Sequence, residues 1–77
     1  MPLVRISVPA GSLDDDKKTL MIAKVTDAVV EAEGFPGARQ FTWALIDEVP
    51  DGGWGMAGRT VTLAQIQASL ARAESRG

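Results

Sequence analysis

The residue with the clearest capacity for chemistry is Pro2, directly after Met1. Proline is small enough to permit removal of Met1, which would leave a secondary amine at the start of a predicted strand. An α-amine titrates at about 7.7–8.0 in model peptides, and desolvation in an apolar pocket lowers that pKa. A neutral amine can take a proton from carbon next to a carbonyl. Position alone does not assign this role, because a Met-Pro start also occurs without catalytic meaning.

The chain lacks most of the other residue types and motifs that commonly carry catalysis. The chain has no His and no Cys, which excludes a catalytic triad, a thiolate nucleophile and disulfide bonds, and argues against a structural zinc or haem site. The run Gly52-Gly53-Trp54-Gly55 lacks the lysine of a Walker phosphate loop. We therefore expect chemistry that needs neither a metal nor a cofactor.

Size and charge narrow the class of protein. Seventy-seven residues, with a net charge of −2 and no basic cluster, predict one small domain over residues 1–77 and argue against a nucleic-acid surface. Arg5, Ser7 and Pro9 interrupt the N-terminal apolar stretch, and no run approaches the length of a membrane span. We expect a soluble, cytoplasmic protein. Because so short a chain builds only a marginal core, we also expect self-association.

The hydrophobic pattern predicts a β-α-β order and an α/β fold. Residues 3–8 alternate as a strand does, with Val4, Ile6 and Val8 on one face. A helix is expected from an N-cap at Ser12 to a stop at Gly34. Its apolar stripe is expected to consist of these residues: Ile22, Val25, Val29 and Ala32. A second strand is predicted over residues 41–49, apolar on both faces and parallel to the first.

Turn-forming residues dominate the next segment. Residues 50–59 are rich in glycine and predict a loop or hairpin that contains Trp54. Thr62 and Gln65 then form a capping-box pattern, which predicts a short C-terminal helix to about Ala73.

Two runs of residues resemble the 4-oxalocrotonate tautomerase family. The first is Pro2-Leu3-Val4-Arg5-Ile6-Ser7-Val8, followed by Gly11 and the Lys17-Lys18 helix; the second is Asp47-Glu48-Val49-Pro50 with Gly53-Trp54-Gly55-Met56-Ala57-Gly58-Arg59. The resemblance covers residues 2 to about 60. It implies a β-α-β subunit, dimers joined through their sheets, and hexamers built as trimers of dimers. It also implies an N-terminal proline as general acid/base, two substrate-binding arginines and an aromatic pocket wall, with Pro2 and Trp54 at the matching positions.

The chain departs from that family pattern at both arginines. Ser12 and Leu13 stand where the first arginine follows the glycine, and Trp43 stands at the second arginine position. Arg39 and Arg59 remain as candidate contacts for a substrate carboxylate, each also explicable as a surface residue. Without both family arginines, a diacid such as 2-hydroxymuconate should be handled poorly.

The leading hypothesis is a cofactor-free tautomerase that acts on the enol of a small 2-oxo acid. Pro2 would be the general acid/base, and an aromatic tail, as in phenylenolpyruvate, would lie between Trp43 and Trp54. One alternative is a lyase that hydrates or dehalogenates an unsaturated acid, with Pro2 acting as an acid. Another is a non-catalytic assembly or binding subunit.

Overall fold

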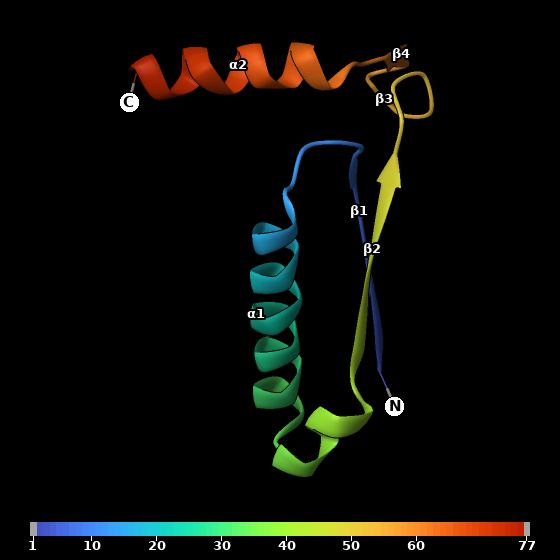
Figure 1. Ribbon diagram of the computed structural model, residues 1–77, viewed down its shortest axis with the longest axis vertical. Helices are drawn as coiled ribbons and strands as arrows, with labels where there is room; N and C mark the ends of the chain where they lie inside the picture. The colour runs from blue at the N-terminus through green and yellow to red at the C-terminus, as the bar shows by residue number, and fades with distance from the viewer. Residues whose placement is uncertain (1, 77) are drawn as a thin grey trace.

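A two-stranded parallel sheet covered by one long helix forms the body of the subunit (Figure 1). The computed structural model describes residues 2–76. Strand register runs from the pair Leu3 and Trp43 to the pair Pro9 and Val49. The elements, in chain order, are β1 (Leu3–Pro9), α1 (Asp15–Glu33), the 3-10 helix η1 (Pro36–Phe41), β2 (Trp43–Val49), β3 (Gly55–Met56), β4 (Arg59–Thr60) and α2 (Leu63–Arg76). The predicted β-α-β order, parallel pairing, hairpin and terminal helix are confirmed.

The two faces of the sheet have different surroundings. Lys18 of α1 pairs with Glu48, so α1 lies over the face that Glu48 shares with Val4 and Ile6. Among residues 2–76 no element covers the opposite face, which Figure 1 shows on the far side of the strands from α1. We call this opposite face the open face. Its eight residues are Leu3, Arg5, Ser7, Pro9, Trp43, Leu45, Asp47 and Val49.

Helix α1 begins two residues later than the Ser12 cap predicted from sequence. Asp14 is the N-cap: it has an extended backbone, and its carboxylate accepts a hydrogen bond from the Lys17 N–H at 2.8 Å. Ser12 instead belongs to the turn after β1, because its N–H donates to the Pro9 carbonyl. The predicted stop is confirmed at Gly34, whose φ of 78° is the left-handed C-cap conformation that glycine adopts at low cost.

The buried stripe of α1 is also displaced from the prediction. Ile22 and Ala32 are exposed, whereas Val25 and Val29 are half-buried and Thr26 is the one residue of the helix that is buried. Thr26 can occupy that place because its hydroxyl donates to the Ile22 carbonyl at 2.7 Å, which leaves no unpaired polar group facing the sheet.

Strand β2 starts at Trp43 rather than at residue 41. Phe35 and Pro36 lead into η1, which includes Phe41, and Thr42 closes the turn with its N–H on the Arg39 carbonyl. A second bond runs from the Thr42 hydroxyl to the Ala38 carbonyl. These local bonds compete with strand geometry, which explains why an alternating pattern overestimated the strand by two residues.

The C-terminal helix starts where the capping box was predicted. The Thr62 N–H donates to the Gln65 side chain at 2.9 Å, and the Gln65 N–H donates to the Thr62 hydroxyl at 3.2 Å. The carboxylate of Asp51 accepts from the Leu63 N–H at 2.8 Å and ties this helix start to the segment after β2. The helix runs to Arg76, three residues beyond the predicted end. No helix within residues 2–76 is long and apolar enough to cross a membrane.

The subunit does not enclose a hydrophobic core of its own. Across residues 2–75, no hydrophobic side chain is buried, and Thr26 is the single buried residue. The accessible surface is 5799 Å², against about 4,500 Å² for a compact monomer of this mass. The radius of gyration is 15.5 Å, against about 11.5 Å for a compact chain of this length. The excess surface is of the size that stable protein interfaces bury.

A small polar network ties α1 and its leading loop to β2. The Gly11 N–H donates to one carboxylate oxygen of Glu48 at 3.4 Å, and Lys18 Nζ lies 3.2 Å from the other. The hydrogen bond from Gly11, followed by the bond and charge of Lys18, lowers the pKa of Glu48 below its ordinary value of 4.5. Because the folded state favours the ionised carboxylate, Glu48 contributes stability that is present above that ordinary value and lost as pH falls through the lowered pKa.

We predict that Glu48→Gln reduces the free energy of unfolding at neutral pH. The deficit relative to the unmodified protein should shrink as pH falls below 4.5, because Glu48 then becomes protonated in the unmodified protein too. Denaturant unfolding between pH 7 and pH 3, at one fixed protein concentration, measures this. Glu31→Gln is the control, since Glu31 is exposed on the same helix and joins none of the ion pairs within residues 2–76. A deficit for Glu48→Gln that stays constant with pH would contradict the assignment.

Candidate functional site

Pro2 is anchored at the beginning of the sheet by a backbone hydrogen bond. Its carbonyl accepts from the Trp43 N–H at 3.2 Å, and the residue is half-buried. This bond extends the β1–β2 ladder by one step, so Pro2 follows the strand instead of leaving it as a loose end. The expected removal of Met1 concerns a residue outside the described part of the chain.

Two apolar residues adjoin Pro2: Leu3 follows it in β1, and Trp43 of β2 holds its carbonyl. Leu3 and Trp43 are cross-strand partners, and they are 44% and 57% exposed. Phe41, at the end of η1, is 53% exposed. The ring of a ligand could pack on such an apolar surface. A ligand or partner that covers the surface would also remove water from a neighbouring amine. The structure therefore brings together Pro2 and Trp43, two of the residues singled out from the sequence.

Trp54 lies at the other end of the strands. It follows the C-terminal end of β2 and, with Ser7, Val8, Pro9 and Val49, lines a cavity of about 90 Å³. Since β1 and β2 are parallel and seven residues long, Pro2 and Trp54 are separated by the strand length, about 23 Å at 3.3 Å per residue. One subunit therefore does not bring Trp54 to Pro2. The indole Nε1 of Trp54 is buried and lacks a partner within residues 2–76.

Arg59 lies close to Trp54. Gly55, the residue after Trp54, approaches the Arg59 carbonyl so closely that a Cβ at position 55 would clash with it. The Val61 N–H also donates to the Trp54 carbonyl at 3.2 Å. Arg59 is exposed and joins none of the ion pairs within the described residues. Its guanidinium is available to an anion.

Arg39 is already engaged elsewhere. It is part of η1, and its guanidinium forms an ion pair with Asp27 of α1. The structure thus ties Arg39 to α1, which covers the opposite face of the sheet from Trp43. Of the two candidate carboxylate contacts, Arg59 is the one whose charge is not neutralised within the subunit.

Sequence reasoning missed one charged feature of the open face. Arg5 donates from Nε to Asp47 Oδ2 at 3.2 Å, and its terminal nitrogen lies 3.2 Å from the same oxygen. The alternation of β1 had assigned Arg5 to the face opposite Val4 and Ile6. The alternation does not specify the register of the two strands. In the observed register Asp47 lies opposite Ser7, one diagonal step from Arg5.

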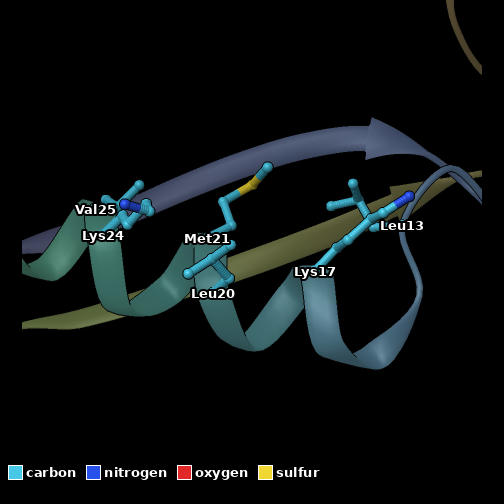
Figure 2. A pocket seen from close by; sticks show the side chains of 6 residues that line it. All are labelled: Leu13, Lys17, Leu20, Met21, Lys24 and Val25. Carbon is cyan, nitrogen blue, oxygen red and sulfur yellow. The ribbon is translucent and has the colours of Figure 1, made fainter.

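A second hollow of the subunit contains none of these residues. It has a volume of about 350 Å³ and is lined by Leu13, Lys17, Leu20, Met21, Lys24 and Val25. Figure 2 shows five of these side chains on one flank of α1 and Leu13 in the loop that precedes it. The groove is apolar apart from the two lysines. No cluster of three or more potential metal ligands occurs within residues 2–76.

The comparisons with known proteins agree with this geometry. The family model described as tautomerase enzyme matches residues 2–64. The 2-hydroxymuconate tautomerases of Comamonas testosteroni and Pseudomonas putida are each 43% identical over 58 residues, which is 75% of this chain and 87% of theirs. The probable tautomerase K2 of Dickeya dadantii (strain 3937) is 36% identical over 69 residues, 90% of this chain and all of that one.

The fold has a close counterpart among solved structures. The crystal structure of an apo unfused 4-OT superimposes with a TM-score of 0.67 at 23% identity, covering 78% of this chain and 93% of the other. The family match spans β1, α1, β2 and the hairpin, which are the elements that carry Pro2, Trp43, Trp54 and Arg59. The chain belongs to the tautomerase family and is an enzyme of the isomerase class.

Proposed function

We propose that this enzyme is a cofactor-independent keto–enol tautomerase of a small 2-oxo acid, with the amine of Pro2 as general acid/base after Met1 is removed. The observation that carries the proposal is the position of Pro2. Its carbonyl is held by the Trp43 N–H, and it adjoins the exposed apolar residues Leu3 and Trp43 at the start of the two strands. Two relatives of the enzyme are 2-hydroxymuconate tautomerases, and this supports the reaction class.

The reaction needs a single group that takes a proton and returns it. The neutral amine of Pro2 would accept the proton of the enol hydroxyl, while the electrons of the O–H bond form the carbonyl and those of the C=C bond move to carbon. The resulting ammonium would then deliver its proton to that carbon, which yields the keto acid and restores the amine. With no His or Cys in the chain, few other groups titrate near neutral pH.

A complete site requires a second copy of the chain. Pro2 and Trp54 lie at opposite ends of the parallel strands, and an antiparallel arrangement of two copies would bring the Trp54 end of one to the Pro2 end of the other. Arg59 would arrive together with Trp54. A site built in this way requires self-association of the enzyme. The exposed apolar surface of the subunit also favours self-association.

The charges favour a monoacid with an apolar tail as the substrate. Arg5 and Arg39 are each paired with an aspartate, and Ser12 and Trp43 carry no charge. One guanidinium, that of Arg59, remains for one carboxylate. A second carboxylate would meet the apolar surface of Leu3 and Trp43, where an unpaired charge loses its hydration. The enol of an aryl pyruvate, such as phenylenolpyruvate, satisfies both conditions.

The first test blocks the Pro2 nitrogen without changing a side chain. A form that retains Met1, or that carries an uncleaved N-terminal tag, has an amide nitrogen and no base. It should fold and assemble normally but ketonise phenylenolpyruvate about 10²- to 10⁴-fold more slowly. The same tag placed at the C-terminus is the control, and intact mass spectrometry reports whether Met1 is present. Equal rates for blocked and free forms would exclude Pro2 as the base.

A second test concerns Trp54. Trp54→Ala removes a large apolar surface and admits water to the amine, so the ascending limb of the pH–rate profile, which reports deprotonation of the Pro2 amine, should move to higher pH. Trp54→Phe keeps an apolar ring and should retain the original profile. Both profiles are measured as kcat/KM for phenylenolpyruvate. If Trp54→Ala leaves the profile unchanged while folding and assembly are intact, Trp54 lies outside the site.

The third test separates the two candidate arginines. Arg59→Ala should raise KM for phenylenolpyruvate about 10- to 100-fold, the cost of one charge-assisted hydrogen bond. Arg39→Ala is the matched control and should leave KM nearly unchanged, because Asp27 already neutralises that guanidinium. The opposite result, with KM sensitive to Arg39 alone, would assign the carboxylate to Arg39.

A further inference from the structure

Helix α2 carries an apolar stripe that finds little cover in its own subunit. The residues of this stripe recur at spacings of three and four, which places them on one face of the helix: Leu63, Ile66, Leu70 and Ala73. Leu70 is 57% exposed, and none of the hydrogen bonds or ion pairs within residues 2–76 joins α2 to α1. A helix of 14 residues is marginal in water, and packing of its apolar face normally supplies most of its stability. The stripe therefore needs a surface that covers it.

The groove on α1 is a surface of matching shape and character (Figure 2). Between Lys17 and Val25 it follows the helix for about 12 Å, and the stripe of α2 between Ile66 and Ala73 is about 10 Å long, at a rise of about 1.5 Å per residue. Leu20, midway along the groove, is 54% exposed. The two surfaces are both apolar, similar in length and open to solvent in the single subunit.

The charges beside these two surfaces are opposite in sign. Lys17 and Lys24 line the groove, whereas Glu74 lies at the edge of the α2 stripe, one helical turn after Leu70. None of the three joins an ion pair in the part of the chain that the structure describes. An acidic edge also argues against an anionic membrane as the partner, because amphipathic helices bind such membranes through basic residues beside the apolar face.

The groove of the same subunit is out of reach of the stripe. Asp51 holds the Leu63 N–H, and the Leu63 side chain lies so near Gly11 that a Cβ at position 11 would come within 3.4 Å of it. These contacts fix the direction in which α2 leaves the hairpin. Figure 1 shows α2 running across the direction of α1 and away from the body of the subunit. The stripe therefore does not lie along a groove that follows α1 of its own chain.

We propose that α2 of one copy docks into the α1 groove of a second copy, with its apolar stripe against Leu20 of the partner subunit and Glu74 beside Lys17 or Lys24 of the partner subunit. The contact is heterologous, because different surfaces of the two copies meet, and each copy supplies one helix and one groove. It is distinct from the sheet-to-sheet dimers that the family resemblance implies. The family model matches only through residue 64, so nearly all of α2 lies beyond it.

Hydrogen exchange of the purified protein tests whether the groove covers α2. The amides of residues 67–74 should be protected in the unmodified protein. Leu20→Asp places a charge in the groove and should speed their exchange at least about 10-fold, the factor that corresponds to burial of one leucine side chain. Ile22→Asp is the matched control, because Ile22 is an exposed apolar residue of α1 that does not line the groove. It should leave the exchange of α2 unchanged.

Crosslinking tests whether the groove belongs to another copy. The chain has no cysteine, so Met21→Cys in the groove and Ala73→Cys in α2 together introduce its only thiols. A short bis-maleimide should join different chains, and mass spectrometry of the denatured protein should show covalent species of at least twice 8.1 kDa. The control combines Met21→Cys with Ala68→Cys, because Ala68 lies on the face of α2 opposite the stripe. This control should keep the mass of one chain.

Four results would overturn the proposal. A crosslink within one chain would show that α2 folds onto its own groove, and the absence of any crosslink would place α2 elsewhere. Equal crosslinking in the Ala68→Cys control, or by either single-cysteine variant, would show that another surface faces the groove or the stripe. Amides of α2 that exchange equally fast in the unmodified and Leu20→Asp proteins would show that the groove does not cover this helix. Phenylenolpyruvate ketonisation is measured separately, because the docking of α2 does not rest on the proposed reaction.

Discussion

One helix on one face of a two-stranded sheet leaves this subunit without a closed hydrophobic core. The proposed association and the proposed site both depend on that missing core. Across residues 2–75 no hydrophobic side chain is buried, and Leu3, Leu20, Trp43 and Leu70 are among the large apolar residues that stay exposed. Two strands cannot shield both faces of a sheet with a single crossover helix. The remaining apolar area is a driving force for association, in a chain that has neither cysteines nor a metal cluster within the described residues to substitute for a core.

The parallel pairing of β1 and β2 determines how the candidate functional residues are distributed. Because both strands run in the same direction, Pro2 and Trp43 share one end of the sheet and Trp54 and Arg59 follow the other. An antiparallel pair would have carried the chain after β2 back toward Pro2. In this topology a site that uses both ends has to combine two subunits, so the same association that completes the hydrophobic core would also complete the proposed site.

The sequence correctly predicted those elements that depend on interactions between residues close in the chain, where no alternative local hydrogen bond competes. The capping box of Thr62 and Gln65 formed as expected because its two hydrogen bonds join residues three apart. Prediction failed where two local hydrogen-bonding patterns competed. Asp14 caps α1 in place of Ser12, and η1 retains Phe41, which the alternating pattern had assigned to a strand. The ion pair of Arg5 and Asp47 depends on strand register, which periodicity does not specify. The roles of Pro2, Trp54 and the arginines stay predictions.

The attachment of Pro2 to the sheet explains how the side chain at position 43 can change without displacing Pro2. The bond that holds the Pro2 carbonyl comes from the backbone N–H of Trp43, which any residue other than proline supplies. The side chain at position 43 is therefore free to change while Pro2 keeps its place. The resemblance to 4-oxalocrotonate tautomerases puts an arginine at this position, and its replacement by tryptophan exchanges a charge for an aromatic surface beside the same backbone contact. With Arg5 paired to Asp47 on the same face, the proposed preference for an apolar ring over a second carboxylate would follow from these two exchanges of charge.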